Sequence, residues 1–241
     1  MALPKLEVPT YELELPVSKK NLKFRPFLVK EQKALLMAME SNDAKTIQHN
    51  VREILNVCTL TEGINIDKLP IIDVEYYFIN LRAKSVSEIA ESRYRCNNMV
   101  EEKECGNIMD VKVNLTEIVP ETDEVVDPVI EITDKISIKM KFPEFGLIQD
   151  SVELTNLTDI TFNMIANSVE YIYDGEQFYY TSETPIEEMV QFIENLNQDQ
   201  FEKVENFFNN IPKLRKRIEM TCSKCGFHHN MNVEGLESFF G

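Results

Sequence analysis

The sequence predicts an α+β fold with a helical N-terminal region, a mixed antiparallel β region with two zinc-ribbon-like hairpins, and C-terminal amphipathic helices. Apolar residues recur at helical spacing up to about residue 85, and the period changes to two near Ser92. Two cysteine pairs then interrupt extended segments. We divide the chain into residues 1–90, a strand segment and helical region, and residues 91–241, a β-rich region with the split cysteine pairs and C-terminal helices. A single integrated domain is the alternative.

Composition places the chain among ordinary globular proteins. Of its 241 residues, 43% are apolar. No apolar run approaches the roughly 18–20 residues that cross a bilayer. Residues 1–17 are polar and proline-punctuated, without the apolar core of a signal peptide. We therefore expect a soluble, intracellular protein with no membrane partner.

The charge balance argues against binding to nucleic acid. Lys and Arg number 25 against 41 Asp and Glu, which gives a net charge of −16. Such a field repels phosphate. The basic cluster Lys213–Arg217 is interpreted as a solvated linker entering a strand. The acidic surface favours solubility or a partner with a basic face.

The first 90 residues alternate briefly and then become helical. Alternating Tyr11, Leu13 and Leu15 predict a strand, and Leu22–Phe27 forms a second extended piece. Three helices are expected next, and the second has Asn42 or Asp43 as its cap. Their ranges are Lys30–Ser41, the segment from that cap to Cys58, and Leu69–Ser85. Cys58 lies on the apolar face of the second helix, so we expect it in the core.

After residue 90 the pattern indicates strands and then helices. Extended segments are expected at Ser92–Cys96, Asn107–Leu115 and Arg217–Cys222, and hairpins at Val129–Phe142 and, around Asp174-Gly175, at Val169–Tyr180. Residues 119–128 read as an exposed acidic loop. Helices are expected near Thr158–Ser168, after Pro185, and near Gln198–Asn210. The last of these has an apolar stripe, which we expect to be buried: Phe201, Val204, Phe208 and Ile211.

Four of the five cysteines form two similar pairs. Cys222 and Cys225 have the spacing of half a zinc site and precede Gly226; Cys96 and Cys105 are more widely spaced, but Gly106 follows them likewise. In each pair a valine stands eight residues after the second cysteine. One hairpin presents two thiolates but cannot surround a tetrahedral ion, whereas two hairpins side by side supply four. We therefore predict that Cys96, Cys105, Cys222 and Cys225 share one structural Zn²⁺.

Two other interpretations of this cluster stay open. The four cysteines can lie close together, reduced, without metal. A histidine can also replace a cysteine that lies out of reach. His228 and His229 point to opposite faces of a strand, so at most one of them can contribute, and we expect both to be exposed or to lie behind the ligands. His49 is expected on the surface.

The motif content predicts no enzyme. Four cysteines close the coordination shell of zinc, whereas a catalytic zinc keeps an open position. The sequence contains no HExxH, HxE…PCxxC, GxSxG or Walker motif, so no catalytic residue is nominated. A zinc hydrolase would require an open position on the metal.

Three segments, taken together, resemble the baseplate hub proteins of T-even-like contractile-tailed bacteriophages. They are "LKFRPFLVKEQKALLMA" at 22–38, "KISIKMKFPEF" at 135–145 and "MTCSKCGF" at 220–227, and the similarity in order covers roughly residues 20–240. The residues that carry it are Phe24, Pro26, Phe27, Lys141, Phe142, Pro143 and the four paired cysteines. The chain departs from the family in the wide Cys96–Cys105 loop and in its extra N-terminal segment.

The resemblance implies a structural or assembly protein that binds other hub and tail proteins. It implies a location in the cytoplasm of the infected cell or in the tail baseplate of the virion. The alternative function is a zinc-ribbon regulator that binds nucleic acid, which the scarcity of Lys and Arg near the two cysteine pairs disfavours.

Overall fold

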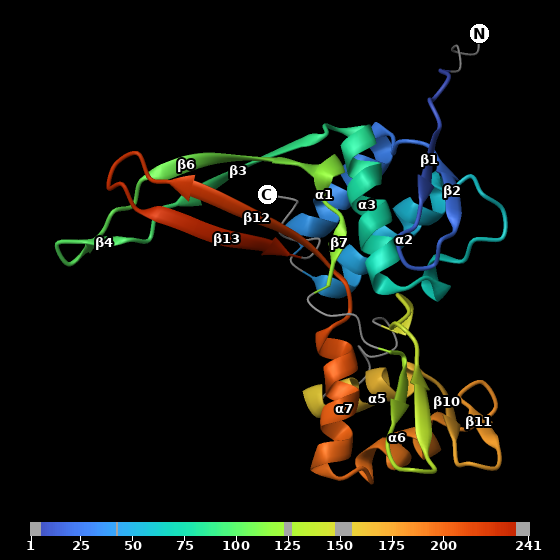
Figure 1. The fold of residues 1–241 in the computed structure, drawn as a ribbon. Coiled ribbons are helices and arrows are strands. Elements are labelled where there is room, and N and C mark those ends of the chain that lie inside the picture. Colours follow the sequence, from blue (N-terminus) through green and yellow to red (C-terminus); the bar gives the residue numbers. More distant parts are fainter. Residues whose placement is uncertain (1–5, 42, 123–126, 148–155, 235–241) are drawn as a thin grey trace.

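The computed structural model describes residues 6–41, 43–122, 127–147 and 156–234. Figure 1 shows a helical lobe, a second lobe below it, and a long arm of strands that projects to one side. The mixed helices and antiparallel sheets confirm the predicted α+β class. No helix in the described ranges is long and apolar enough to cross a membrane.

The helical lobe contains a two-stranded antiparallel sheet and three helices. Its elements are β1 (Tyr11–Glu14), β2 (Asn21–Phe24), α1 (Val29–Glu40), α2 (Ala44–Cys58), the 3-10 helix η1 (Ile66–Lys68) and α3 (Ile71–Ser85). Asp43 caps α2, because its carboxylate accepts the Thr46 N–H at 3.0 Å. The other predicted cap, Asn42, lies outside the described residues. Cys58 is fully buried, as expected.

A buried carboxylate fastens the first strand pair to α3. Asp73, in the first turn of α3, is fully buried and accepts the backbone N–H groups of Val17 and Ser18, each at 2.8 Å. Phe24 and Tyr77 meet edge to face with ring centroids 5.4 Å apart in the core of this lobe.

The second lobe packs three helices on a four-stranded antiparallel sheet of order β11-β10-β9-β8 (Figure 1). Its elements are β8 (Val129–Glu131), β9 (Ser137–Met140), α5 (Leu157–Asn167), β10 (Val169–Tyr173), β11 (Phe178–Tyr180), α6 (Ile186–Glu194) and α7 (Gln198–Asn209). Both predicted hairpins are present. The Asp174 N–H donates to the Gln177 carbonyl at 3.3 Å, so Gly175 and Glu176 occupy the centre of that turn, one residue later than the Asp-Gly pattern suggested.

The apolar stripe of α7 is centred differently from the prediction. Val204 is fully buried, and Phe207, which the stripe omitted, is only 4% exposed. Phe201, Phe208 and Ile211 are partly buried against the same cluster. The buried face of the helix is therefore centred on Val204 and Phe207 rather than on the predicted stripe.

The arm consists of two long hairpins. Strand β3 (Ile89–Arg95) pairs with β6 (Ile108–Asn114), and β12 (Lys213–Thr221) pairs with β13 (His228–Glu234). The remaining elements are β4 (Met99–Val100), β5 (Lys103–Glu104), the 3-10 helix η2 (Leu115–Glu117) and β7 (Pro120–Glu121). Figure 1 shows the two hairpins side by side, with β4 at the far end of the arm.

Two sequence interpretations of connecting segments are wrong in part. The basic cluster Lys213–Arg217 is not a linker but the first half of β12, and its Leu214 is 1% exposed. Lys213 and Leu214 pair with Glu121 and Pro120, so the segment read as an acidic loop contributes strand β7. Strand pairing with partners distant in the sequence decides both cases. Residues 123–126 of that loop lie outside the described residues.

A third apolar cluster joins the arm to the helical lobe. Val111, Val113 and Leu214 of the arm pack with Ile72 and Ile79 of α3, and all five are buried. The base of the arm is therefore held by core packing, while its far end lies away from both lobes (Figure 1).

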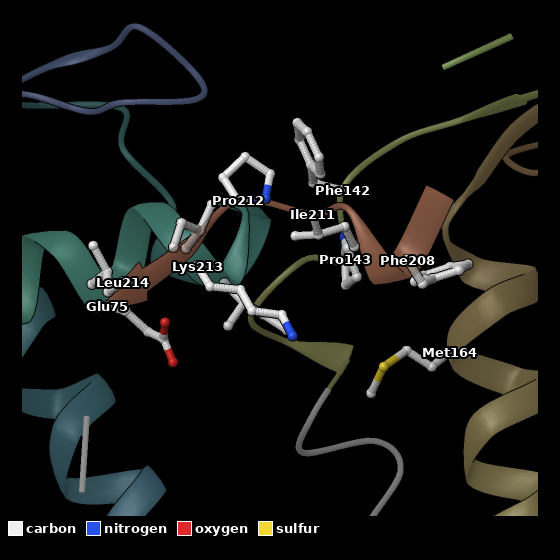
Figure 2. A pocket seen from close by; sticks show the side chains of 11 residues that line it. Glu75, Phe142, Pro143, Met164, Phe208, Ile211, Pro212, Lys213 and Leu214 are labelled. Carbon is white, nitrogen blue, oxygen red and sulfur yellow. The ribbon is translucent and has the colours of Figure 1, made fainter. Parts of the chain in front are cut away.

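An apolar groove of about 290 Å³ lies where the two lobes and the arm meet (Figure 2). Ile72 of α3, Phe142, Met164 and Phe208 are among the residues that line it. Ile211 and Pro212, which connect α7 to β12, cross it. This position explains why Phe208 and Ile211 are only partly buried.

Candidate metal centre

The four paired cysteines meet in the outer part of the arm. Cys96 directly follows β3, Cys105 follows β5, Cys222 follows β12, and Cys225 lies in the turn before β13. Their sulfur atoms all lie within 4.8 Å of one another. Two hairpins far apart in the sequence therefore contribute two thiols each, in the arrangement predicted from the sequence.

Two of the sulfur–sulfur distances match the edge of a tetrahedron around a metal ion. Cys96 Sγ lies 3.7 Å from Cys225 Sγ, and Cys105 Sγ lies 3.8 Å from Cys222 Sγ. A tetrahedral zinc with Zn–S bonds of about 2.3 Å places its sulfurs about 3.8 Å apart. Disulfide bonds would require about 2.05 Å. All five cysteines are free thiols.

The two cysteine loops have the same backbone hydrogen bonds. In the first, the Cys96 carbonyl accepts the Gly106 N–H at 3.0 Å; in the second, the Cys222 carbonyl accepts the Gly226 N–H at 2.8 Å. The N–H of each first cysteine donates to the residue after the glycine. Both glycines have positive φ, +65° and +73°, which favours a residue without a Cβ. The weak repeat in the sequence thus corresponds to a repeated turn.

Side chains of each hairpin donate hydrogen bonds to the cysteines of the other. From the first hairpin, the amide of Asn98 lies 3.7 Å from Cys225 Sγ, and that of Asn107 lies 3.5 Å from Cys222 Sγ. From the second, Lys224 Nζ donates to the Cys105 carbonyl at 3.0 Å. Donors of this kind offset the negative charge of thiolates.

His229 of the second hairpin also contacts a cysteine of the first hairpin. It is 5% exposed, and its Nε2 lies 3.1 Å from Cys96 Sγ. The rings of Tyr94 and Phe227 pack edge to face against it, with centroids 5.1 and 4.8 Å away. His228 points to the other face, is exposed, and meets Thr221 Oγ1 at 2.8 Å. The predicted opposition of the two histidines is confirmed, and His229 is the buried one behind the cysteines.

The surroundings of the cysteines shift the pKa values of Cys222 and Cys96 in opposite directions. The backbone N–H groups of Cys225 and Lys224, helped by Asn107, lower the pKa of Cys222 to about 6 although burial opposes this. Burial raises the pKa of Cys96 to about 12. Four thiolates this close repel one another, so a bound cation would favour the state in which all of them are ionised. The cluster therefore offers four sulfur ligands within 4.8 Å of one another, the kind of ligand that a thiophilic divalent ion binds.

Sequence reasoning identified the thiols but not the donors behind them. Asn98 and Asn107 stand in loops rich in polar residues, and no pattern distinguishes them from their neighbours. Their role follows from the side-by-side packing of the two hairpins. For His229, the sequence did offer an indication: it follows His228 directly in a strand, so the two side chains lie on opposite faces.

One comparison with known proteins supports a phage baseplate protein. A family model described as T4 bacteriophage base plate protein matches residues 8–241. A search of curated proteins and a search of solved structures give no match. Because the family model spans nearly the whole chain, the protein belongs to the T4 bacteriophage base plate protein family.

Proposed function

We propose that this protein is a non-enzymatic structural or assembly component of the baseplate hub, which binds other hub and tail proteins. Membership of the baseplate family supports a structural role in the phage tail. The hub assignment rests on the segments at 22–38, 135–145 and 220–227. The protein would act in the cytoplasm of the infected cell, where tails assemble, and in the baseplate.

The same proposal includes one structural Zn²⁺ held by Cys96, Cys105, Cys222 and Cys225. The observation that carries it is the set of four sulfurs within 4.8 Å. Bound zinc would neutralise the thiolates and hold together two hairpins that have little apolar core between them at this end. Four protein ligands fill a tetrahedral shell, so the site favours architecture over catalysis.

The net charge of −16 supports protein partners rather than nucleic acid or an anionic membrane. A surface of this composition binds phosphate poorly.

Affinity purification of the tagged chain from infected cells, with mass spectrometry, tests the partner assignment. We expect other baseplate hub and tail proteins to co-purify. Recovery of nucleic-acid-processing proteins alone, or a shift of DNA in a gel at low salt, would favour the regulator instead.

Elemental analysis of the purified protein tests the metal. We expect one zinc per chain. An iron content with the visible absorption of an iron–thiolate centre would show that the tetrad selects a different ion.

A further inference from the structure

The wide loop between Cys96 and Cys105 forms a small hairpin at the far end of the arm. Strands β4 and β5 pair antiparallel, Met99 with Glu104 and Val100 with Lys103. Figure 1 shows β4 beyond the ends of the two long hairpins, away from both lobes. All six residues from 99 to 104 are exposed. We call residues 99–104 the tip hairpin.

The base of the tip hairpin is fixed, whereas its outer part lacks support. The Cys105 N–H donates to the Asn98 carbonyl at 2.8 Å, and both Cys96 and Cys105 are buried in the cysteine cluster. Beyond this base, each strand has only two residues. A two-stranded hairpin of this size is at best marginally stable in water, so it gains most from burial against another surface.

The tip hairpin exposes apolar side chains that contribute nothing to the core of the chain. Met99 is 59% exposed and Val100 is 45% exposed. At the same end of the arm, Ile108 and Phe227 are 63% and 45% exposed. Methionine adapts its shape to irregular pockets, which suits a side chain that enters a partner.

The turn of the tip hairpin consists of two glutamates, although such turns usually contain uncharged residues. Glu101 and Glu102 are its two central residues, and both have positive φ, 48° and 67°. Two-residue hairpin turns with these angles favour Asn-Gly, because glutamate adopts them reluctantly. With Glu104, three carboxylates stand against the one ammonium group of Lys103.

We propose that the tip hairpin is a docking element that enters an apolar depression bordered by Lys and Arg on another baseplate protein, with Met99 on one face of the hairpin and Val100 on the other. This inference rests on the proposed function and specifies the surface used. Its acidic turn repels nucleic acid, anionic lipid and the identical tip of a second copy. A basic rim around an apolar pocket complements both features of the tip hairpin.

Site-specific photo-crosslinking in infected cells locates the contact. A benzophenone amino acid replaces Val100 in the full-length chain, and the control carries it at Leu157, which is 81% exposed on α5 of the second lobe. We expect the Val100 probe to cross-link a phage baseplate protein at a residue flanked by Lys or Arg. We expect the Leu157 probe not to label that site.

Substitutions then measure the contribution of each feature with the purified partner that the probe identifies. Met99→Ser/Val100→Ser should weaken binding at least about tenfold, in the range for buried anchors. Val29→Ser, at an 82% exposed position on α1, should not change it. Glu101→Asn/Glu102→Gly keeps the turn type but removes two charges, and it should lower the association rate and its dependence on salt.

The outcomes separate this inference from the proposed function. If wild type co-purifies with baseplate proteins but the Val100 probe labels nothing, or only a second copy of the chain, the docking inference is wrong and the proposed function stands. Unchanged affinity of the Met99→Ser/Val100→Ser protein has the same meaning. If wild type recovers no baseplate protein, both proposals fail. An unchanged zinc content shows that the variants keep their arm intact.

Discussion

Cys105 Sγ and Cys222 Sγ lie 3.8 Å apart although 117 positions separate them in the sequence. The second lobe is formed entirely by the chain between these two cysteines (Figure 1). A metal ion at this point would close that part of the chain into a loop. Closing a loop of this length restricts the unfolded chain strongly, although measured gains in stability often fall short of the entropy estimate.

Cys96→Ser should remove the metal and loosen the distant hairpin. Zinc content by elemental analysis is expected to fall from one per chain, and hydrogen exchange over residues 218–233 to become faster, because Cys96 and Cys225 share the site. Cys58→Ala, in the core of the helical lobe, is the matched control and should keep its zinc. Retention of zinc in a chain with both Cys96 and Cys105 replaced would mean that a histidine completes the site.

His229→Phe should weaken zinc binding without abolishing it. The change removes the group 3.1 Å from Cys96 Sγ but keeps an aromatic ring between Tyr94 and Phe227. Loss of a hydrogen bond behind a metal ligand costs about 10–100-fold in affinity. Competition with a zinc chelator measures it. His228→Phe, on the opposite face, should leave the affinity unchanged; equal losses in the two proteins would contradict the assignment.

Phe207→Ala should destabilise the second lobe more than Phe208→Ala. Phe207 is 4% exposed, and truncation of a buried phenylalanine costs about 3–5 kcal/mol. Phe208 is only partly buried and lines the groove in Figure 2, so we expect about 1–3 kcal/mol. Urea unfolding at equilibrium measures both. If Phe208→Ala keeps full stability but loses a baseplate partner, the groove is an interface.

Glu31 should contribute stability that is lost in acid. It is 8% exposed; burial opposes its charge, but hydrogen bonds from Arg25 and the Leu28 N–H lower its pKa below the ordinary 4.5. A lowered folded-state pKa stabilises the protein above the unfolded value, and this contribution disappears as pH falls through the folded one. The unfolding free energy of wild type should therefore exceed that of Glu31→Gln at pH 7, and the difference should shrink in acid.

Glu12→Gln is the control for this comparison, because Glu12 is exposed on β1. Its unfolding free energy should follow wild type across the same pH range. A Glu31→Gln difference that stays constant down to pH 3 would show that the carboxylate contributes through its shape rather than its charge.

Elements whose pattern is local could be predicted from the residues alone. The helical period of α2, with Val51, Leu55 and Cys58 on one face, and the alternation around Ile138 both predict what the structure shows. The glycines after Cys105 and Cys225 likewise indicated two similar loops. A cysteine followed by a glycine of positive φ is a property of adjacent residues, so the sequence pattern reveals it.

The place where those loops meet, and the side chains around it, depend on packing between segments that are far apart in the sequence. Whether Lys213–Arg217 is a linker or a strand depends on its partners in β7 and β13, which are distant in the sequence. The donors Asn98 and His229 gain their roles only because the two hairpins lie side by side. Hydrogen bonds and sulfur distances between distant segments depend on how those segments pack in three dimensions. A local sequence pattern therefore cannot predict them.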